Sequence, residues 1–518
     1  MSIGRPHSPL LRICLFAGCL ALVGAAPVRA APPQIEIMFE ARVCRPPYTG
    51  RVYVVTTTRA EQRPLDGVAW FDCQPFFAQD VVNWAPGEVL QLDPARCLGH
   101  PHDLAQLPPG EYRVQAVLNL DTRSHDVLRA PGNAVSDVTE LTHDPARPAT
   151  LRLTINERLP ALRLVDSESV KYARLMSRRL SAFHGRYVHM YAAVLLPESY
   201  DASPHQRFPT VYVISGFGGT ILDTQMGQLF QYACATEDFD AVVVLLDADC
   251  PTGHHVFADS ANNGPWGTAL VEEFIPYLEH RFRLIPEAGA RYVTGVSSGG
   301  WSSLWLQITH PDAFGGVWSL SPDPVDFSAF QLLDIYAPDA NFLYDAEGNP
   351  NRVSRPGPWG PGLRAPDFWR LEATLGRGGQ LQSFEAVFSP RGPDGRPRPL
   401  WDRRTGRIDP EVATAWKQYD IRLKIEAEWP TLGPRLRGKL HLVCGDQDEF
   451  YLERAFVRLR SALRTLGSDA VVDLVPGAGH GLTPREYQRS VAQMKATYES
   501  RYGAAGDRLA RCAERAPG

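Results

Sequence analysis

The sequence predicts an α/β fold: a mostly parallel sheet flanked by helices and interrupted by an inserted cap, preceded by an N-terminal all-β sandwich. Three observations lead to this prediction. Early in the chain, short runs bounded by Pro or Gly contain apolar and polar residues in alternation. Later in the chain, apolar segments typical of strands alternate with amphipathic segments typical of helices. A long stretch rich in Pro and Gly interrupts this later pattern. We expect the sandwich over residues 31–160, the α/β domain over 161–518 and the cap over about 323–437.

Composition fits a folded protein and argues against some partners. The chain has 518 residues, 44% of them hydrophobic and 21% charged, which is typical of globular domains. Its 53 basic and 58 acidic side chains leave a net charge of −5, which gives no electrostatic reason to expect nucleic acid or an anionic membrane surface as a partner. We therefore expect no nucleic-acid partner, while the oligomeric state stays open.

Residues 1–30 have the pattern of an export signal. Arg5 and Arg12 precede an apolar run from Ile13 to Ala26, and small residues flank Arg29 where a signal peptidase reads the chain. The run is shorter than the about 20 residues that a membrane span needs. We expect cleavage after residue 30, a periplasmic or extracellular protein and no integral span in the mature chain. The alternatives are a membrane anchor and lipidation at Cys19.

The chain has nine cysteines, and export would place those of the mature protein outside the cytoplasm, where disulfides can form. Cys14 and Cys19 belong to the leader, and the odd number that remains leaves at least one cysteine without a partner in the chain. Cys234 and Cys250 lie in one short stretch, and we expect them to form a disulfide. There is no CxxC motif to indicate a structural zinc site.

The runs of the first domain are rich in β-branched and aromatic residues, which favours an Ig-like sandwich. They are Arg51–Thr58, Glu111–Asn119 and Ala149–Ile155. Five aromatic residues accompany them, namely Trp70, Phe71, Phe76, Phe77 and Trp84. We interpret these aromatic residues as the core and the packing face against the next domain, in preference to a ligand or carbohydrate site.

The second domain opens with a predicted connecting helix near Ser167 to Leu180. About seven strands and their intervening helices follow, enough for a doubly wound sheet. The strand runs are Tyr187–Leu196, Thr210–Ile214, Ala241–Asp247, Arg291–Val296, Gly316–Leu320, Lys439–Cys444 and Ala470–Val475. The helical runs are Leu270–Phe282, Ser302–Thr309, Leu452–Leu466 and Pro484–Tyr498. A structureless loop as long as 323–437 is improbable in a compact domain, so this stretch is interpreted as a cap, with a helical pattern at Pro410–Glu428.

The strongest local signal is the pattern GxSxG at 295–299, followed by Gly300, between a predicted strand and a predicted helix. A sharp strand-to-helix turn there projects the hydroxyl of its middle serine above the sheet, and glycines are needed where side chains would clash. Ser297 is therefore the candidate nucleophile. Backbone N–H groups that stabilise a developing oxyanion are expected from Ser298 and from the loop after Thr210–Ile214, where Phe217 is preferred and Gly216 is the alternative.

A serine nucleophile needs a base, oriented by an acid, and both are expected after the serine in the chain. Three histidines follow Ser297, and we assign the base to His480, in a glycine-rich loop after the last strand, rather than to His310 or His441.

The orienting acid has three candidates. Asp448 follows the strand 439–444 with the pattern of a glycine, two residues and an aspartate, and we prefer it. Asp446 is interpreted as a turn former. Asp323, one strand earlier, is the remaining alternative.

Four segments resemble the putative-esterase group of α/β-hydrolases, which includes esterase D-type, enterochelin esterase-like and feruloyl esterases and mycolyltransferases. They are YVISGFGG at 212–219, the segment at 262–282, the elbow at 293–322 and GDQDEFY at 445–451. The resemblance spans roughly 185–320 and 438–500.

The resemblance implies an α/β-hydrolase sheet and an enzyme without cofactor or metal. Such an enzyme cleaves a carboxylic ester, small or glycan-linked, through an acyl-enzyme formed by a triad of Ser297, Asp448 and His480. The alternatives are an acyltransferase that uses a sugar or lipid hydroxyl, a prolyl-oligopeptidase-like serine peptidase, and a binding protein built on the same scaffold.

Overall fold

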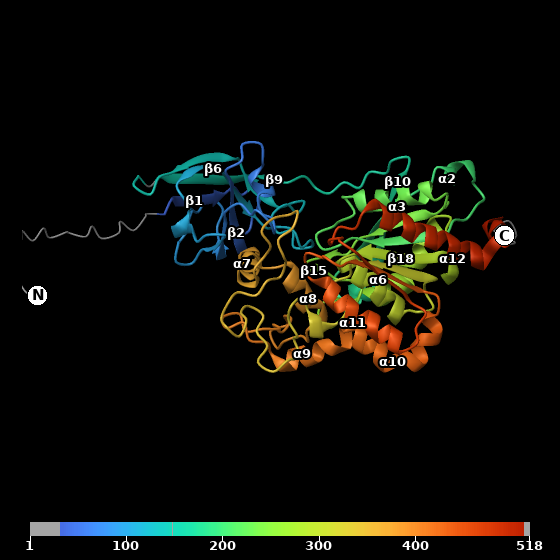
Figure 1. Cartoon of the computed structure of the whole chain (residues 1–518). Coiled ribbons are helices and arrows are strands. Elements are labelled where there is room, and N and C mark those ends of the chain that lie inside the picture. The colour runs from blue at the N-terminus through green and yellow to red at the C-terminus, as the bar shows by residue number, and fades with distance from the viewer. Residues whose placement is uncertain (1–31, 148, 512–518) are drawn as a thin grey trace, which may run out of the picture.

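The computed structural model describes residues 32–147 and 149–511. An all-β part at the N-terminal side lies next to a larger part built of a sheet and helices, and cap helices α7 (Ala365–Leu375) and α8 (Gln380–Phe388) lie where the two meet (Figure 1). The predicted export signal and Cys512 lie outside the described residues.

The N-terminal part contains nine strands. They are β1 (Gln34–Phe39), β2 (Tyr48–Thr57), β3 (Phe76–Trp84), β4 (Leu90–Gln91), β5 (Leu98–His100), β6 (Gly110–Leu118), β7 (Ala134–Ser136), β8 (Thr139–His143) and β9 (Thr150–Arg158). One-turn helices η1 (Pro64–Asp66) and η2 (Leu104–Gln106) interrupt the loops. The strands form one sheet in the order β4-β1-β9-β7-β6-β2-β3-β5, with β8 paired to β6.

This sheet curls over its own core. Phe39 of β1 and Trp84 of β3 are far apart in the strand order, yet their ring centroids lie 4.7 Å apart. The two ends of the sheet therefore face each other, and one connected sheet replaces the two separate sheets of the predicted sandwich. Phe77 and Trp84 belong to the enclosed core, while Phe76 is buried on the opposite face together with Leu371 of the cap.

The second sheet has eight strands in the order β10-β11-β13-β12-β18-β19-β20-β21. They are β10 (Val170–Ser177), β11 (Val188–Leu195), β12 (Thr210–Ile214), β13 (Val242–Leu246), β18 (Arg291–Val296), β19 (Gly316–Leu320), β20 (Leu440–Gly445) and β21 (Val471–Val475). The pairs β10–β11 and β11–β13 are antiparallel, and the pairs from β13 to β21 are parallel. Two-residue strands pair as β14 (Asp249–Cys250) with β15 (Gly253–His254) and β16 (Asp259–Ser260) with β17 (Gly264–Pro265).

The connecting helix predicted near Ser167 to Leu180 is wrong. Most of that segment is strand β10, which pairs with β11 along its whole length from Val170 to Ser177. Helix α1 (Arg178–His184) begins only after it, where the Ser177 hydroxyl accepts a hydrogen bond from the Leu180 amide. This segment forms a strand because it pairs with the edge of the sheet, and this pairing outweighs its local preference for a helix.

Helices cover both faces of the second sheet. One face packs against α3 (Gln225–Thr236) and α12 (Pro484–Arg511), and the other against α5 (Ile275–Arg281), α6 (Ser298–Thr309) and α11 (Leu452–Thr465). The remaining short elements are α2 (Ser199–Ala202), α4 (Trp266–Ala269), the π-helical turn η3 (Leu270–Phe274), η4 (Ala288–Ala290), η5 (Phe327–Ala329) and η6 (Lys417–Tyr419). No helix in residues 32–147 and 149–511 is long and apolar enough to cross a membrane.

The cap connects the two parts. Besides α7 and α8 it contains α9 (Pro410–Trp416) and α10 (Ile421–Leu436), so the helical pattern predicted at 410–428 corresponds to these two helices. Helix α7 lies on the N-terminal sheet, where the Tyr53 hydroxyl donates to the Leu375 carbonyl at 2.6 Å. Arg377, between α7 and α8, donates to the carbonyls of Ser124 and Pro251, which belong to the two different parts.

The predicted Cys234–Cys250 disulfide is also wrong. All six cysteines in the described part of the chain are free. Cys234 is buried in the core that α3 forms with the sheet, whereas the Cys250 sulfur lies 3.2 Å from the Thr252 hydroxyl. Proximity in sequence did not bring the two sulfurs together.

Candidate active site

Ser297 occupies a strained turn between β18 and α6. Its φ of 60° and ψ of −123° are unfavourable for a residue with a side chain. Its own N–H donates to the carbonyls of Leu320 and Ser321 at 3.1 Å, which holds the turn against the end of β19. A side chain at Gly299 would collide with the Ile214 carbonyl oxygen, so the turn requires glycine there. Ser297 is partly exposed although its neighbours on both sides are buried.

Asp448, which is buried, and His480, which is partly exposed, form a pair at the same edge of the sheet. The Asp448 side chain is fully buried, and its Oδ2 lies 2.7 Å from His480 Nδ1. The other carboxylate oxygen accepts the Phe450 N–H at 2.8 Å, which fixes the carboxylate. The two residues follow β20 and β21, and parallel strands bring their carboxyl ends to one edge.

The surroundings of His480 favour its charged form. Burial acts to lower the pKa of the imidazole, but Asp448, Asp323 and Glu449 outweigh it and raise the pKa above the ordinary histidine value. Glu449 also accepts the backbone N–H of His480 at 2.6 Å. Because Nδ1 is engaged by Asp448, Nε2 is the nitrogen left to act as a base.

The competing residues lie elsewhere. Asp446 Oδ1 accepts the Gly477 N–H at 2.7 Å and shapes the loop before His480. His441 is near the start of β20, at the opposite edge of the sheet, and stacks on Trp318 with a centroid distance of 4.4 Å. His310 follows the last turn of α6, a helix of 12 residues and therefore about 18 Å from the end that carries Ser298.

The loop after β12 faces the serine. A Cβ added to Gly216 would lie 3.3 Å from the Ser297 Cβ, so the backbone of this loop approaches the nucleophile closely. The loop turns tightly, with the Gly219 N–H donating to the Gly216 carbonyl at 3.1 Å. From the other side, Ser298 begins α6, where backbone N–H groups have no partner within the helix. The loop that contains Gly216 and Phe217, and the start of α6 at Ser298, therefore both lie beside Ser297.

A second carboxylate touches the serine itself. Asp323, which follows β19, accepts a hydrogen bond from Ser297 Oγ to Oδ1 at 3.2 Å and from Ser298 Oγ to Oδ2 at 2.5 Å. Burial raises the pKa of Asp323. No hydrogen bond joins Ser297 Oγ to His480 in the part of the chain that the structure describes. The sequence named Asp323 only as an alternative partner for the histidine, and its contacts with the two serines were missed.

Aromatic rings from four segments surround the site. Trp70 of the N-terminal part stacks on Phe217, with centroids 5.5 Å apart and an interplanar angle of 21°. The Phe450 ring lies 5.0 Å from the His480 ring, and the Trp359 ring of the cap lies 6.2 Å from it. Trp359 is 42% exposed and so offers an open apolar face. Phe450 and Trp359 could not be predicted from the sequence, since nothing local marks them.

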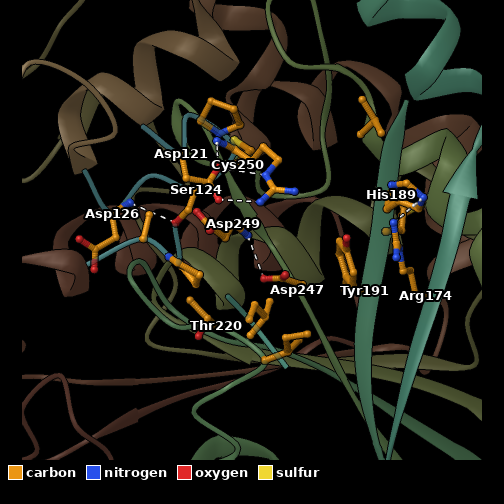
Figure 2. A pocket seen from close by; sticks show the side chains of 18 of the residues that line it. Asp121, Ser124, Asp126, Arg174, His189, Tyr191, Thr220, Asp247, Asp249 and Cys250 are labelled. Atoms are coloured by element: carbon orange, nitrogen blue, oxygen red, sulfur yellow. Dashed lines mark hydrogen bonds and ion pairs between the residues drawn. The ribbon is translucent and has the colours of Figure 1, made fainter. Parts of the chain in front are cut away.

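A separate cavity of about 1270 Å³ lies between the N-terminal part, the linker and strands β10 and β11. Figure 2 shows Asp247 and Asp249 in it, with Arg174 and His189 farther along the wall. Burial and Asp249 raise the pKa of Asp247 to about 7. Ser297, Asp448 and His480 are not among the residues that line this cavity. Within residues 32–147 and 149–511, no three metal-binding side chains gather into a cluster.

Comparison with known proteins identifies the family. The family model described as Putative esterase matches residues 188–469, which is more than half of the chain and includes Ser297 and Asp448. The chain belongs to this family. It is therefore a carboxylic ester hydrolase, with small-molecule esters as its substrates. No curated protein sequence matches the chain.

Comparison with solved structures finds proteins that are distant in sequence. A ferulic acid esterase is 15% identical to this chain, with a TM-score of 0.40, and the match covers 64% of this chain and 98% of the esterase. The fluorophosphonate-binding serine hydrolase FphF of Staphylococcus aureus is 14% identical, with a TM-score of 0.38, covering 63% and 98%. An S-formylglutathione hydrolase from Agrobacterium tumefaciens is 13% identical, with a TM-score of 0.37, covering 64% and 95%.

Proposed function

We propose that the protein is an exported serine esterase with an α/β-hydrolase fold, in which Ser297, His480 and Asp448 form the catalytic triad. The observation that carries the proposal is the strained, partly exposed Ser297 at the same sheet edge as the Asp448–His480 pair with a free Nε2. The strand order, two antiparallel pairs followed by parallel strands, supports the fold. Export is supported by the basic and apolar pattern of residues 1–30.

The proposed reaction follows from these contacts. His480 Nε2 takes the proton of the Ser297 hydroxyl as Oγ attacks the ester carbonyl, and Asp448 stabilises the imidazolium through Nδ1. Backbone N–H groups of Ser298 and of Phe217 or Gly216 stabilise the oxyanion. The imidazolium then protonates the leaving alcohol, and water, activated by the same histidine, releases the acid from the acyl-enzyme. The side chain of Ser297 must first rotate from Asp323 toward His480.

Labelling with a fluorophosphonate probe tests this proposal. The native protein is expected to form a covalent adduct and to hydrolyse p-nitrophenyl acetate, whereas Ser297→Ala is expected to do neither. The Ser303→Ala variant is a matched control, because Ser303 lies in α6 and its hydroxyl donates to the Gly300 carbonyl. Labelling of Ser297→Ala at the native level would refute the assignment of the nucleophile.

A further inference from the structure

The carboxylate of Asp323 is fixed against the nucleophile by several independent contacts. Its backbone N–H donates to the Ser297 carbonyl at 3.1 Å. Its Oδ1 accepts from the Ser297 hydroxyl and its Oδ2 from the Ser298 hydroxyl. The amide of Gln380, at the start of cap helix α8, adds a donor to Oδ2 at 3.3 Å. Asp323 is only 7% exposed, so it is held rigidly and largely without water.

The donors around Asp323 suit an ionised carboxylate. A carboxylate accepts hydrogen bonds and donates none, so the Gln380 amide must turn its nitrogen toward Oδ2. The Ser298 bond is short, which is typical of a charge-assisted contact, whereas the 3.2 Å bond from Ser297 is long for a hydroxyl donor. The long bond is the weaker one, so the Ser297 hydroxyl can leave Asp323 while Ser298 and Gln380 keep the carboxylate in place.

Asp323 also acts on the base. The charged groups that face His480 are Asp448 and Glu449, from the loop after β20, and Asp323, from the loop after β19. Two aromatic rings, of Phe450 and Trp359, also lie against His480. Asp448 holds the Nδ1 side of the imidazole, while Asp323 contacts the serine that Nε2 must deprotonate.

We propose that Asp323 is a further catalytic residue, a second carboxylate that holds the Ser297 hydroxyl in the free enzyme and stabilises the His480 imidazolium during attack. This rests on the proposed function. When the O–H bond of Ser297 breaks, its proton moves to His480 Nε2, the bond from Oγ to the carbonyl carbon forms, and the carbonyl electron pair moves to the oxyanion. Asp323 has by then lost the Ser297 donor, because that side chain has rotated toward His480; the carboxylate keeps its charge and transfers no proton.

The pH profile of kcat/KM with p-nitrophenyl acetate tests the proposal through the variant Asp323→Asn. The amide is nearly isosteric but uncharged, so His480 loses one of the charges that raise its pKa. We expect the acid limb to move about 1 unit to lower pH. That shift corresponds to about a tenfold loss of kcat, because the imidazolium forms in the transition state and the variant stabilises it less. KM should change little, because the lost interaction is not made with the bound substrate. A residue that only supported the fold would lower the plateau and leave the limb in place.

Two further variants and one measurement make the result decisive. Asp446→Asn is the matched control, because Asp446 contacts the Gly477 N–H and does not face the imidazole, so its acid limb should not move. If thermal unfolding shows that Asp323→Asn is misfolded, Ser298→Ala is the second variant: it removes the short hydroxyl bond to Oδ2, together with the contact from the Gln380 amide to that hydroxyl, and should shift the limb in the same direction by less. An unmoved acid limb in the folded variant overturns the role of Asp323. Retained activity of Ser297→Ala would instead overturn the proposed function itself.

Discussion

Replacing Trp70 by alanine tests whether the N-terminal part supports the oxyanion loop. The Trp70 ring contacts Phe217, Phe368 and Phe450 with centroid distances of 5.5, 5.2 and 6.0 Å. Aromatic pairs contribute about 0.5–1.5 kcal/mol each beyond the buried area, so the three pairs alone contribute about 1.5–4.5 kcal/mol, and Trp70→Ala should lower the free energy of unfolding by at least that amount. Only the Phe217 stack bears directly on the backbone expected to bind the oxyanion.

The effect of Trp70→Ala on the activation free energy should therefore be only a part of its effect on the free energy of unfolding. If the energy of that stack, about 0.5–1.5 kcal/mol, is lost from the positioning of the oxyanion loop, kcat falls by about 2- to 13-fold. Steady-state kinetics on p-nitrophenyl acetate, at a temperature where the variant is folded, measures this loss. Trp70→Phe retains a ring over Phe217 and should recover most of the rate.

Phe71→Ala is the matched control from the same loop. Its ring contacts Trp359 and Phe450 at 6.1 and 6.5 Å, so its loss should leave the support of Phe217 intact and lower kcat less. Equal losses of kcat in Trp70→Ala and Phe71→Ala, or an unchanged kcat in folded Trp70→Ala, would refute the reasoning.

Three other predictions concern the site and the core. Asp448→Asn should lower kcat by several orders of magnitude, measured by ester hydrolysis, because the amide cannot hold the same imidazole tautomer; activity near the native level would contradict the triad. In the native enzyme, the raised pKa of His480 places the acid limb of kcat/KM above 6.5, and activity is lost as the pH falls through it; a limb below 6.5 would mean that burial outweighs the carboxylates. Because Cys234 and Cys250 are free, a reducing agent should leave the melting temperature unchanged, and a drop on reduction would indicate a disulfide.

The serine turn could be predicted because its determinants are local. The glycines and the serine lie within five residues, so the pattern is recognisable in the sequence, although the clash that requires Gly299 is with Ile214 on a neighbouring strand of the sheet. The choice of Asp448 over Asp446 also followed from spacing, and the structure pairs Asp448 with His480. In both cases, the residue lies directly after a strand of the sheet, so the position of the strand's end also fixes the position of the side chain.

The surroundings of the site could not be predicted, because they depend on contacts between distant segments. Trp70, Phe217 and Trp359 come from three segments of the chain, and no periodicity links them. The same limit explains strand β10, whose state is decided by pairing with β11 rather than by its own residues. Asp323 was visible as an acid after β19, but its donor Gln380 comes from the cap, whose path the sequence does not reveal.

The cap determines how the parts of this protein act together. Arg377 bonds to Ser124 of the N-terminal part and to Pro251 of the catalytic part, and three residues later Gln380 reaches the carboxylate that holds Ser297. A displacement of the N-terminal part would therefore reach the nucleophile through a few rigid contacts at the start of α8. The same displacement would reach the oxyanion loop through Trp70. Two separate sets of contacts thus join the N-terminal part to the proposed site, one through Gln380 at Asp323 and one through Trp70 at Phe217. These contacts favour a supporting role of the N-terminal part at the site over a role as a separate binding module.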